Sequence, residues 1–232
     1  MRSWLLVPGH RPGQFTTAVA DEVILDLKDA VPSEHKESAR GQVVRWLDDG
    51  GQAWVRVNAP DSQWHRDDLT ALRDSPGLRG VVVPKVQGQA TVRRVEQLLP
   101  DAPILAVVET AVGVEDALAV AACVAVSGLV FDSIRFTLDI GSDGSDESLA
   151  FARGALVVAA RAAALPPPLD GVTAGSRNPD VVHAAATRAR RLGFGGMLSN
   201  DPAHIAAINR AFDSELAGGT LAGVRGLLVA HP

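Results

Sequence analysis

Residues 104–113 read Ile-Leu-Ala-Val-Val-Glu-Thr-Ala-Val-Gly. An unbroken apolar run rich in Val and Ile is typical of a strand that is buried on both faces, as in a parallel sheet. Glu109 stands at the carboxyl end of this strand, the end that faces the ligand crevice in barrels and open sheets of the α/β class. The alternative is that Glu109 belongs to the first turn of the next helix. Most other apolar runs also end in a charged or strongly polar residue, which favours the first interpretation.

Apolar runs and helical segments alternate along the whole chain. Such alternation indicates parallel strands joined by right-handed crossovers, and eight units of this kind close into a (β/α)8 barrel. A doubly wound open sheet is the alternative, but neither a GxGxxG nor a GxxxxGK[ST] phosphate loop supports it. We expect strands at residues 4–7, 22–27, 53–58, 80–85, 104–109, 128–132, 169–172 and 194–199. We expect helices at residues 11–20, 33–47, 65–73, 89–99, directly after Glu109, and at 147–164, 179–192 and 202–216.

Composition indicates one domain. The chain has 232 residues, of which 47% are hydrophobic, so we expect a barrel over residues 1–217 and a Gly-rich tail over residues 218–232. The net charge of -5 and the scattered basic residues argue against nucleic acid or an anionic membrane as a partner. One cysteine and the lack of an apolar run of roughly 18 residues predict a cytoplasmic protein without a membrane span.

Charged side chains of both signs are expected around the carboxyl face of this barrel. Buried charges must be paired or bound to a ligand, so such a ring is either a solvated ion-pair network or a site for a small anion. Arg56 alternates with Val55 and Val57 in a strand, so it points either into the barrel or out toward the helices. A substrate-binding role is favoured, because a guanidinium suits carboxylates and carbonyl oxyanions. The residues expected on this face are Pro8, Gly9, Arg11, Asp26, Lys28, Asp29, Arg56, Asn58, Lys85, Glu109, Asp132, Arg135, Asp170, Asn200 and Asp201. A structural role is an equal alternative for Lys85 and Asp170, and capping of a loop is the alternative for Asn58.

Six motifs occur in an order that resembles one family. They are Arg2-Ser3-Trp4-Leu5-Leu6-Val7-Pro8-Gly9 with Arg11-Pro12, Leu25-Asp26-Leu27-Lys28-Asp29-Ala30-Val31, Val55-Arg56-Val57-Asn58, Val83-Pro84-Lys85-Val86, Glu109-Thr110-Ala111 and Asp170-Gly171-Val172-Thr173. The ordered set resembles the citrate lyase beta-subunit-like branch of the HpcH/HpaI aldolase family, over nearly the whole chain.

The resemblance implies a barrel of carbon–carbon lyases that act on 3-hydroxyacyl thioesters, such as malyl, citramalyl or citryl groups of coenzyme A. It implies a divalent metal, usually Mg2+, held by Glu109 and an Asp of the next strand, and a homo-oligomer, either a trimer or a hexamer. An enolate forms in a retro-aldol cleavage, and a metal and a fixed guanidinium stabilise its charge. We expect catalytic roles for Arg56, Glu109 and Asp29, and substrate-binding roles for Arg56, Lys28, Arg135, Pro8 and Gly9. The candidate metal ligands are Glu109, from the family pattern, and Asp132, which would replace the family ligand whose position Arg135 occupies.

Three positions depart from the family pattern. Lys28 stands where the family typically has Glu, Arg135 where it has the second metal-binding Asp, and Asn200-Asp201 where it has Ile-His. We expect Arg135 to pair with Glu109 and repel Mg2+, unless Asp132 becomes the second ligand. Binding of Mg2+ is therefore expected to be weak or absent.

Three hypotheses follow for the function. The first is a lyase or aldolase with altered metal or substrate use, in which Arg56, Arg135 and Lys28 bind a small carboxylic acid or acyl-CoA and Glu109 positions Arg135. The second is a catalytically silent relative that binds a small carboxylate or a partner protein, with Arg135 closing the site. The third is a thioester hydrolase on the same scaffold.

Overall fold

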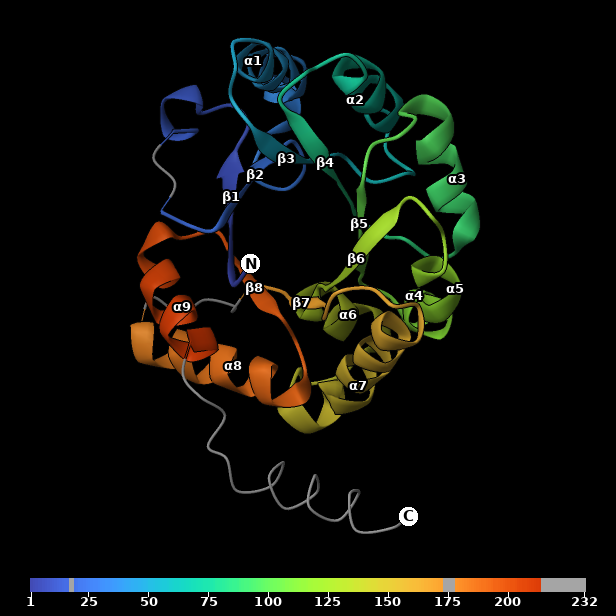
Figure 1. Ribbon diagram of the computed structural model, residues 1–232, viewed down its shortest axis with the longest axis vertical. Coiled ribbons are helices and arrows are strands. Elements are labelled where there is room, and N and C mark those ends of the chain that lie inside the picture. Colours follow the sequence, from blue (N-terminus) through green and yellow to red (C-terminus); the bar gives the residue numbers. More distant parts are fainter. Residues whose placement is uncertain (17–18, 173–177, 214–232) are drawn as a thin grey trace, which may run out of the picture.

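The computed structural model describes residues 1–16, 19–172 and 178–213, and every structural statement below refers to these residues. Eight parallel strands pair in sequence order, and β8 closes on β1. Figure 1 shows them as an inner ring with the helices outside it. The (β/α)8 barrel is confirmed, and the open-sheet alternative is wrong. The strands are β1 Ser3–Pro8, β2 Glu22–Asp26, β3 Ala53–Arg56, β4 Leu78–Val83, β5 Ile104–Val108, β6 Val126–Phe131, β7 Leu169–Asp170 and β8 Gly196–Ser199.

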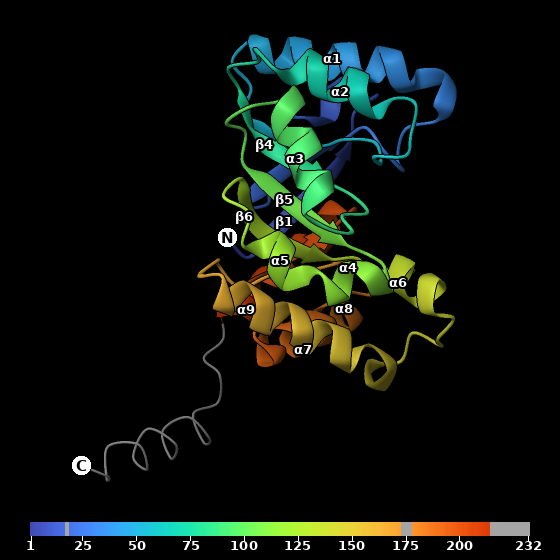
Figure 2. The same cartoon turned by 90° about the vertical axis from the view of Figure 1, so that its right-hand side faces the viewer.

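The helices form the outer layer, which Figure 2 shows from the side of α5 and α7. None of the helices in the described part of the chain is both long and apolar enough to span a bilayer. The helices are α1 Lys36–Asp48, α2 His65–Leu72, α3 Gln89–Leu98, α4 Ala111–Glu115, α5 Ala117–Ala121, α6 Ser133–Ile140, α7 Asp146–Ala162, α8 Pro179–Leu192 and α9 Ile205–Asp213, with 3-10 turns η1 Pro12–Gln14, η2 Ser33–His35 and η3 Pro202–His204.

Two helix predictions need correction. The helix expected at residues 11–20 is wrong: the described part of this segment contains only η1, because Pro12 and Gly13 do not propagate a helix and Phe15 turns inward to pack edge-on against Trp46. The additional helix α6 was not predicted. It begins at Asp132, whose carboxylate caps it, and ends at Gly141 in the left-handed region, with φ of 67°. The expected end of the last helix after residue 213 and the tail at 218–232 lie outside the described residues.

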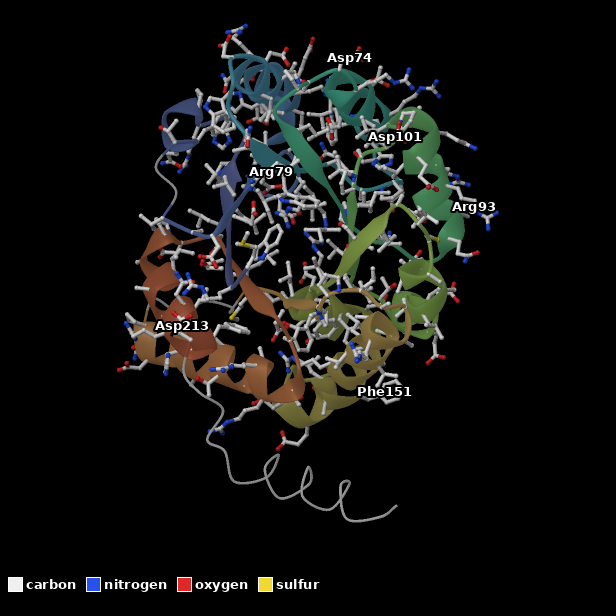
Figure 3. All side chains as sticks on the ribbon, viewed as in Figure 1. Asp74, Arg79, Arg93, Asp101, Phe151 and Asp213 are labelled. Carbon is white, nitrogen blue, oxygen red and sulfur yellow. The ribbon has the colours of Figure 1, made fainter. Side chains whose placement is uncertain are left out.

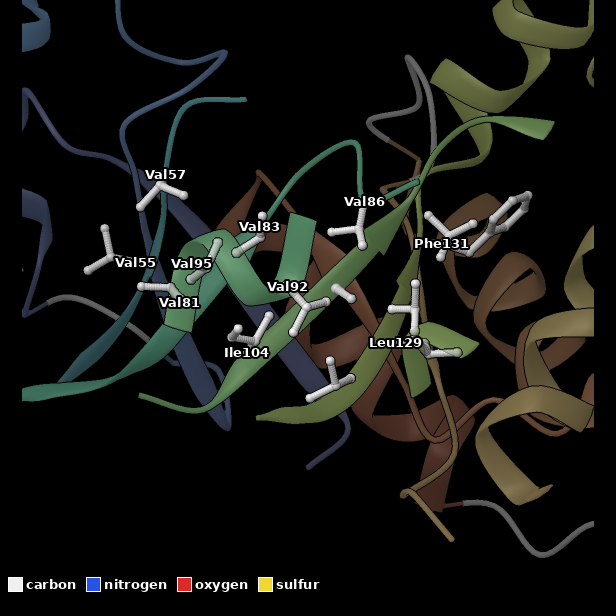
Figure 4. Close-up of a cluster of buried hydrophobic side chains, with 14 of the residues drawn as sticks. Val55, Val57, Val81, Val83, Val86, Val92, Val95, Ile104, Leu129 and Phe131 are labelled. Atoms are coloured by element: carbon white, nitrogen blue, oxygen red, sulfur yellow. The ribbon is translucent and has the colours of Figure 1, made fainter. Parts of the chain in front are cut away.

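The core has two shells. Inside the barrel, alternate side chains of the strands pack together, and the rings of Trp4 and Trp54 meet edge to face with centroids 5.6 Å apart. The intervening side chains pack outward against the helices, as Val81 and Ile104 do with Val92 and Val95 of α3 (Figure 4). The barrel is therefore filled with side chains, and the mouth at the carboxyl ends of the strands is left for a site.

Arg2 and Asp21 tie the start of β1 to the segment before β2. The backbone N–H and the guanidinium of Arg2 donate to both oxygens of Asp21 at 2.7 to 3.0 Å. These hydrogen bonds lower the pKa of Asp21 to about 2.

The low pKa of Asp21 predicts a pH-dependent loss of stability in acid. Because the pKa in the folded state lies below the unfolded value of about 4, the contribution of Asp21 is complete above that pH and is lost as the pH falls toward 2. Asp21→Asn should therefore lower the free energy of unfolding at neutral pH and flatten its decline in this range. Urea titrations at several pH values measure the free energy of unfolding. A pH profile that Asp21→Asn leaves unchanged would contradict the role given to Asp21.

Candidate active site

The alternation of side chains along the strands places the charged residues of the site. Val107 of β5 fills the barrel interior, so Glu109, two residues later, points toward the same axis at the mouth. Ile24, Trp54 and Val130 also pack inside the barrel. The charged residues two positions after them, Asp26, Arg56 and Asp132, therefore point toward the axis as well. Four neighbouring or nearby strands therefore deliver charged side chains to one end of the barrel.

Two hollows open at this mouth. The first has a volume of about 520 Å³ and contains Arg56, and the second, of about 410 Å³, contains Lys28 and Glu109. Arg135 and Leu138 of α6 line both hollows. The first hollow is lined by Leu6, Pro8, Asp26, Asp29, Ala30, Arg56, Val82, Val107, Val130, Phe131, Asp132, Ile134, Arg135, Leu138, Gly171, Val172, Leu198 and Asn200.

Arg56 is held rigidly by Asp26. The Nε and Nη2 atoms of Arg56 donate to the two carboxylate oxygens of Asp26 at 2.8 and 2.7 Å, and Asp26 is completely buried. Asp26 also accepts from the backbone N–H groups of Lys28 and Ala30. Burial opposes the charge of both partners, but their attraction outweighs it, raising the pKa of Arg56 and lowering that of Asp26. The guanidinium is thus a fixed cation.

Three cations converge on the carboxylate of Asp29. Its oxygens lie 2.5 Å from Arg135, 3.4 Å from Arg56 and 3.8 Å from the ammonium of Lys28. The Asp29 side chain is 40% exposed, so it lies at the rim rather than in the core. The arrangement shows that these three cations can surround a single carboxylate at the opening of the site.

Lys28 lies over Glu109. Its Nζ atom is 3.5 Å from each of the two carboxylate oxygens, and Glu109 is only 5% exposed. Burial raises the pKa of Glu109, although Lys28 partly opposes this shift, and burial lowers the pKa of Lys28 against the attraction of Glu109 and Asp29. In both residues desolvation is the larger effect and the attraction between the two charges is the smaller one.

The predicted pairing of Arg135 with Glu109 is wrong. Within the described residues, the guanidinium of Arg135 pairs with Asp29 and more distantly, at 3.8 Å, with Asp132, while Glu109 is taken by Lys28. The reason is the start of α6: Asp132 caps this helix by accepting the backbone N–H of Arg135, which directs the Arg135 side chain along the rim toward the loop after β2.

Several residues expected on this face make contacts with other parts of the protein. The N–H of Gly9 donates to the carbonyl of Asp26, and Gly9 does not line the hollow, whereas Pro8 does. Asp170 faces away from the barrel axis and lies 3.3 Å from the buried guanidinium of Arg153 in α7, so its place on the active face is wrong. Arg11 is exposed, and the side chain of Asn58 donates to Asp68. Lys85 pairs with Asp61 at the edge of the second hollow. The side chain of Asp201 caps η3.

Lys36 is a positioning residue that the sequence reading missed. Its buried ammonium donates to the backbone carbonyls of Leu27 and Lys28 and to the side-chain oxygen of Asn58, at 2.5 to 2.7 Å. It therefore fixes the loop that carries Lys28 and Asp29. A lysine in the first turn of a helix, where cations are disfavoured by the dipole, is the signal that could have revealed it.

The residues present do not fit a magnesium ion. Mg2+ requires oxygen ligands around it, whereas the oxygens of Glu109 face the ammonium of Lys28 and Asp132 is engaged in capping α6. In the described segments, no three carboxylate, imidazole or thiol groups lie close enough together to hold a metal ion. The predicted ligands Glu109 and Asp132 therefore lack the partners that a metal site needs.

Comparisons with known proteins identify the family. Residues 2–202 match HpcH/HpaI aldolase/citrate lyase. The chain is 33% identical over 225 residues to a (3S)-malyl-CoA thioesterase of Cereibacter sphaeroides, covering 93% of this chain and 78% of that protein. It is 34% identical over 229 residues to a citrate lyase subunit beta-like protein of Deinococcus radiodurans, covering 91% of this chain and 80% of that protein.

Comparison with solved structures supports the same family. The citrate lyase beta subunit of M. tuberculosis complexed with oxaloacetate and magnesium superimposes with a TM-score of 0.81 at 28% identity, covering 91% of this chain and 96% of that one. The CitE protein of Mycobacterium tuberculosis in complex with magnesium, acetoacetate and coenzyme A superimposes with a TM-score of 0.82 at 27% identity, covering 99% of this chain and 86% of that one. By sequence and by fold, the chain belongs to the HpcH/HpaI aldolase/citrate lyase family.

Proposed function

We propose that the protein is a carbon–carbon lyase that cleaves or forms a 3-hydroxyacyl thioester or a related hydroxy acid through an enolate, with fixed cationic side chains in place of a metal. The observation that carries this proposal is the convergence of Lys28, Arg56 and Arg135 on the carboxylate of Asp29 at the mouth of the barrel. Relatives of known structure bind small carboxylates and coenzyme A.

The substrate carboxylate takes the place of Asp29 between Arg135 and Lys28. The carbonyl oxygen next to the reacting carbon then lies against Arg56, whose guanidinium is already oriented by Asp26 and needs no reorganisation. Glu109, with its raised pKa, accepts the proton of the 3-hydroxyl group as the carbon–carbon bond breaks. The electron pair of that bond moves onto the carbonyl oxygen as an enolate, and return of the proton from Glu109 to the enolate carbon completes the cleavage and restores the carboxylate.

Thioester hydrolysis is a second candidate, because the thioesterase of Cereibacter sphaeroides matches nearly the whole chain. In this reaction Glu109 activates water, and Arg56 stabilises the oxyanion of the tetrahedral intermediate. One substrate distinguishes the two reactions: lyase action on malyl-CoA gives acetyl-CoA and glyoxylate, and hydrolysis gives malate and the free thiol of coenzyme A.

The experiment is an assay of the purified protein with malyl-CoA in EDTA, with separate detection of glyoxylate and free thiol. Glyoxylate release that EDTA does not reduce supports the lyase, and thiol release supports the hydrolase. A thermal-shift screen with oxaloacetate, pyruvate, glyoxylate, malate and acetyl-CoA runs beside it. If neither product forms, no acid raises the melting temperature and Arg56→Ala changes nothing, the proposal fails and the protein is a catalytically silent relative.

Asp29→Asn is expected to tighten binding of small carboxylates about tenfold, or about 1.4 kcal/mol, because it removes the anion that competes for the three cations. Calorimetry with oxaloacetate measures the affinity. Asp61→Asn is the control, because it removes a carboxylate whose ion-pair partner, among the residues that the structure describes, is Lys85 at the edge of the second hollow. Weaker binding in Asp29→Asn would mean that Asp29 itself serves the ligand, as the catalytic role predicted from the family pattern requires.

A further inference from the structure

A third hollow lies beside the mouth, between α6, α7, α8 and the end of β7. It has a volume of about 350 Å³, and it shares residues of α6 and the two residues after β7 with the first hollow. The charged side chains that line it are Asp143, Asp146, Arg153, Asp170 and Arg188. None of these five side chains lines the first or the second hollow. The third hollow is therefore a polar space with charged groups of its own.

Arg153 lies on the buried side of α7. Its side chain is 4% exposed, whereas Phe151, on roughly the opposite side of the helix, is 72% exposed and lies on the outer side of the helix ring (Figure 3). A helix that packs on a barrel normally turns apolar side chains inward and charged ones outward. Because α7 reverses this order at these two positions, the buried guanidinium needs partners that offset its loss of water.

Two donor atoms of Arg153 lack hydrogen-bond partners within the described part of the chain. Its Nε atom lies 3.3 Å from Asp170 and its Nη1 atom lies 3.7 Å from Asp146, but neither buried atom makes a hydrogen bond to a described residue. The buried Nε atom of Arg188, on α8, is in the same condition. Buried N–H donors are almost always paired with protein, with ordered water or with a ligand. Unfilled donors from two helices therefore border one hollow.

Asp146 shows what the two guanidiniums can hold between them. Its Oδ2 atom is 3.0 Å from Nη1 of Arg188, and its Oδ1 atom is 3.7 Å from Nη1 of Arg153. The Asp146 side chain is 55% exposed and belongs to the first residue of α7, so it can turn to solvent without leaving a buried charge. One carboxylate can thus bridge Arg153 and Arg188, although this one does not fill the donors of Arg153.

The charges of the hollow favour an anion once Asp146 turns outward. Of the described side chains that line it, Arg153 and Arg188 then face one buried carboxylate, that of Asp170, so one positive charge is not compensated. Asp143 is exposed, and its carboxylate accepts a backbone N–H of the turn before α7. Solvent and salt screen an exposed charge of this kind.

We propose that the third hollow binds a small oxyanion, an inorganic phosphate or a carboxylate, between Arg153 and Arg188. A guanidinium presents a planar fork of donors that matches two oxygen atoms of either group. The anion accepts hydrogen bonds from the donors that the described residues leave unfilled, and Asp146 makes room by turning to solvent. The site does not depend on the lyase proposal, because it uses none of the charged side chains of the mouth.

Calorimetric titration of the full chain with phosphate and with malate tests this site, and Arg188→Gln is the disrupting variant. All titrations use an Arg135→Gln background, because the cations of the mouth also attract anions. Arg188→Gln should weaken binding at least about tenfold, since it removes charge-assisted hydrogen bonds. Arg191→Gln, which removes an exposed arginine of the same helix, is the matched control and should leave the affinity unchanged. Failure of both anions to bind, or binding that Arg188→Gln leaves unchanged, overturns the proposal.

Two further variants test the roles of the individual side chains. Arg153→Lys keeps the buried charge but loses the planar fork, so it should weaken binding about as much as Arg188→Gln does. If Arg153→Lys does not fold, the exposed position of Arg188 still decides the test.

Asp146→Asn should tighten anion binding, because it removes the carboxylate that competes for the two guanidiniums. Asp180→Asn, which removes the exposed acid in the first turn of α8, is the matched control. Weaker binding in Asp146→Asn would overturn the proposed arrangement, because Asp146 would then serve the ligand.

Hydrogen exchange of the full chain locates the bound anion. Phosphate or malate should slow exchange in the first turn of α7 in the wild type, and Arg188→Gln should abolish this protection. Tighter binding of phosphate than of malate assigns the site to free phosphate, and the reverse order assigns it to a carboxylate. Protection confined to the loop after β2 would place the anion at the mouth and overturn the proposal.

Discussion

Replacing Asp26 by asparagine is expected to lower the free energy of unfolding by about 3 to 5 kcal/mol. Asp26 is fully buried and accepts two hydrogen bonds from Arg56 and two from backbone N–H groups. Asparagine removes the negative charge and presents an NH2 group to donors, so among the described residues the guanidinium of Arg56 keeps only its longer, 3.4 Å contact with the exposed carboxylate of Asp29. Urea unfolding monitored by circular dichroism measures the loss.

Asp61→Asn is the matched control for this experiment. Asp61 also pairs with a cation, Lys85, at 2.6 Å, but its side chain is 64% exposed and that of Lys85 is 41% exposed. Exposed pairs of this kind contribute about 0 to 1 kcal/mol. Equal losses in the two variants would show that burial does not distinguish the Asp26 pair.

Lys28→Glu combined with Arg135→Asp is expected to raise the affinity for Mg2+ at least about 100-fold over the wild type. At 4 Å and an effective dielectric constant near 20, two unit charges interact by about 4 kcal/mol, so removing one cation beside Glu109 and adding carboxylates changes the affinity strongly. These two substitutions restore the acids that the family pattern carries at these positions. Each single variant should give an intermediate affinity, because each supplies one carboxylate and removes one cation.

Calorimetric titration with MgCl2 measures this change. Arg93→Glu, an exposed position on α3, is the control for net charge alone and should leave the affinity unchanged. If the wild type already binds Mg2+ at micromolar concentration through Glu109, the electrostatic argument is wrong. Asp132→Asn would then reveal whether Asp132 supplies the second ligand.

The barrel could be predicted because it depends on periodic features that each segment carries alone. Eight apolar runs predicted the eight strands. The alternation of Val55, Arg56 and Val57 left two directions for the guanidinium, and the structure places it on the side of the barrel interior. The helix prediction for residues 11–20 was wrong for a local reason. Pro12 and Gly13 do not propagate a helix, and the side chain of Phe15 turns inward and is buried.

The ion pairs of the site could not be predicted, because they depend on distances between strands and on the reach of long side chains. Asp26 faces Arg56 because β2 and β3 pair in that register. Lys28 rather than Arg135 reaches Glu109, because Asp132 starts a helix that turns Arg135 toward Asp29. From the sequence these residues could be assigned to one mouth, but the one pairing predicted among them, Arg135 with Glu109, was wrong.

The most direct test of the anion site is calorimetric titration of oxaloacetate into the wild type and Arg56→Lys, each in EDTA and in excess Mg2+. Lysine keeps the charge but cannot form the two-point contact with a carboxylate or an enolate oxygen. The cationic site predicts wild-type binding with the same dissociation constant in both buffers and binding at least about tenfold weaker in Arg56→Lys, or about 1.4 kcal/mol. Binding that appears only when Mg2+ is present, or that Arg56→Lys leaves unchanged, would contradict it.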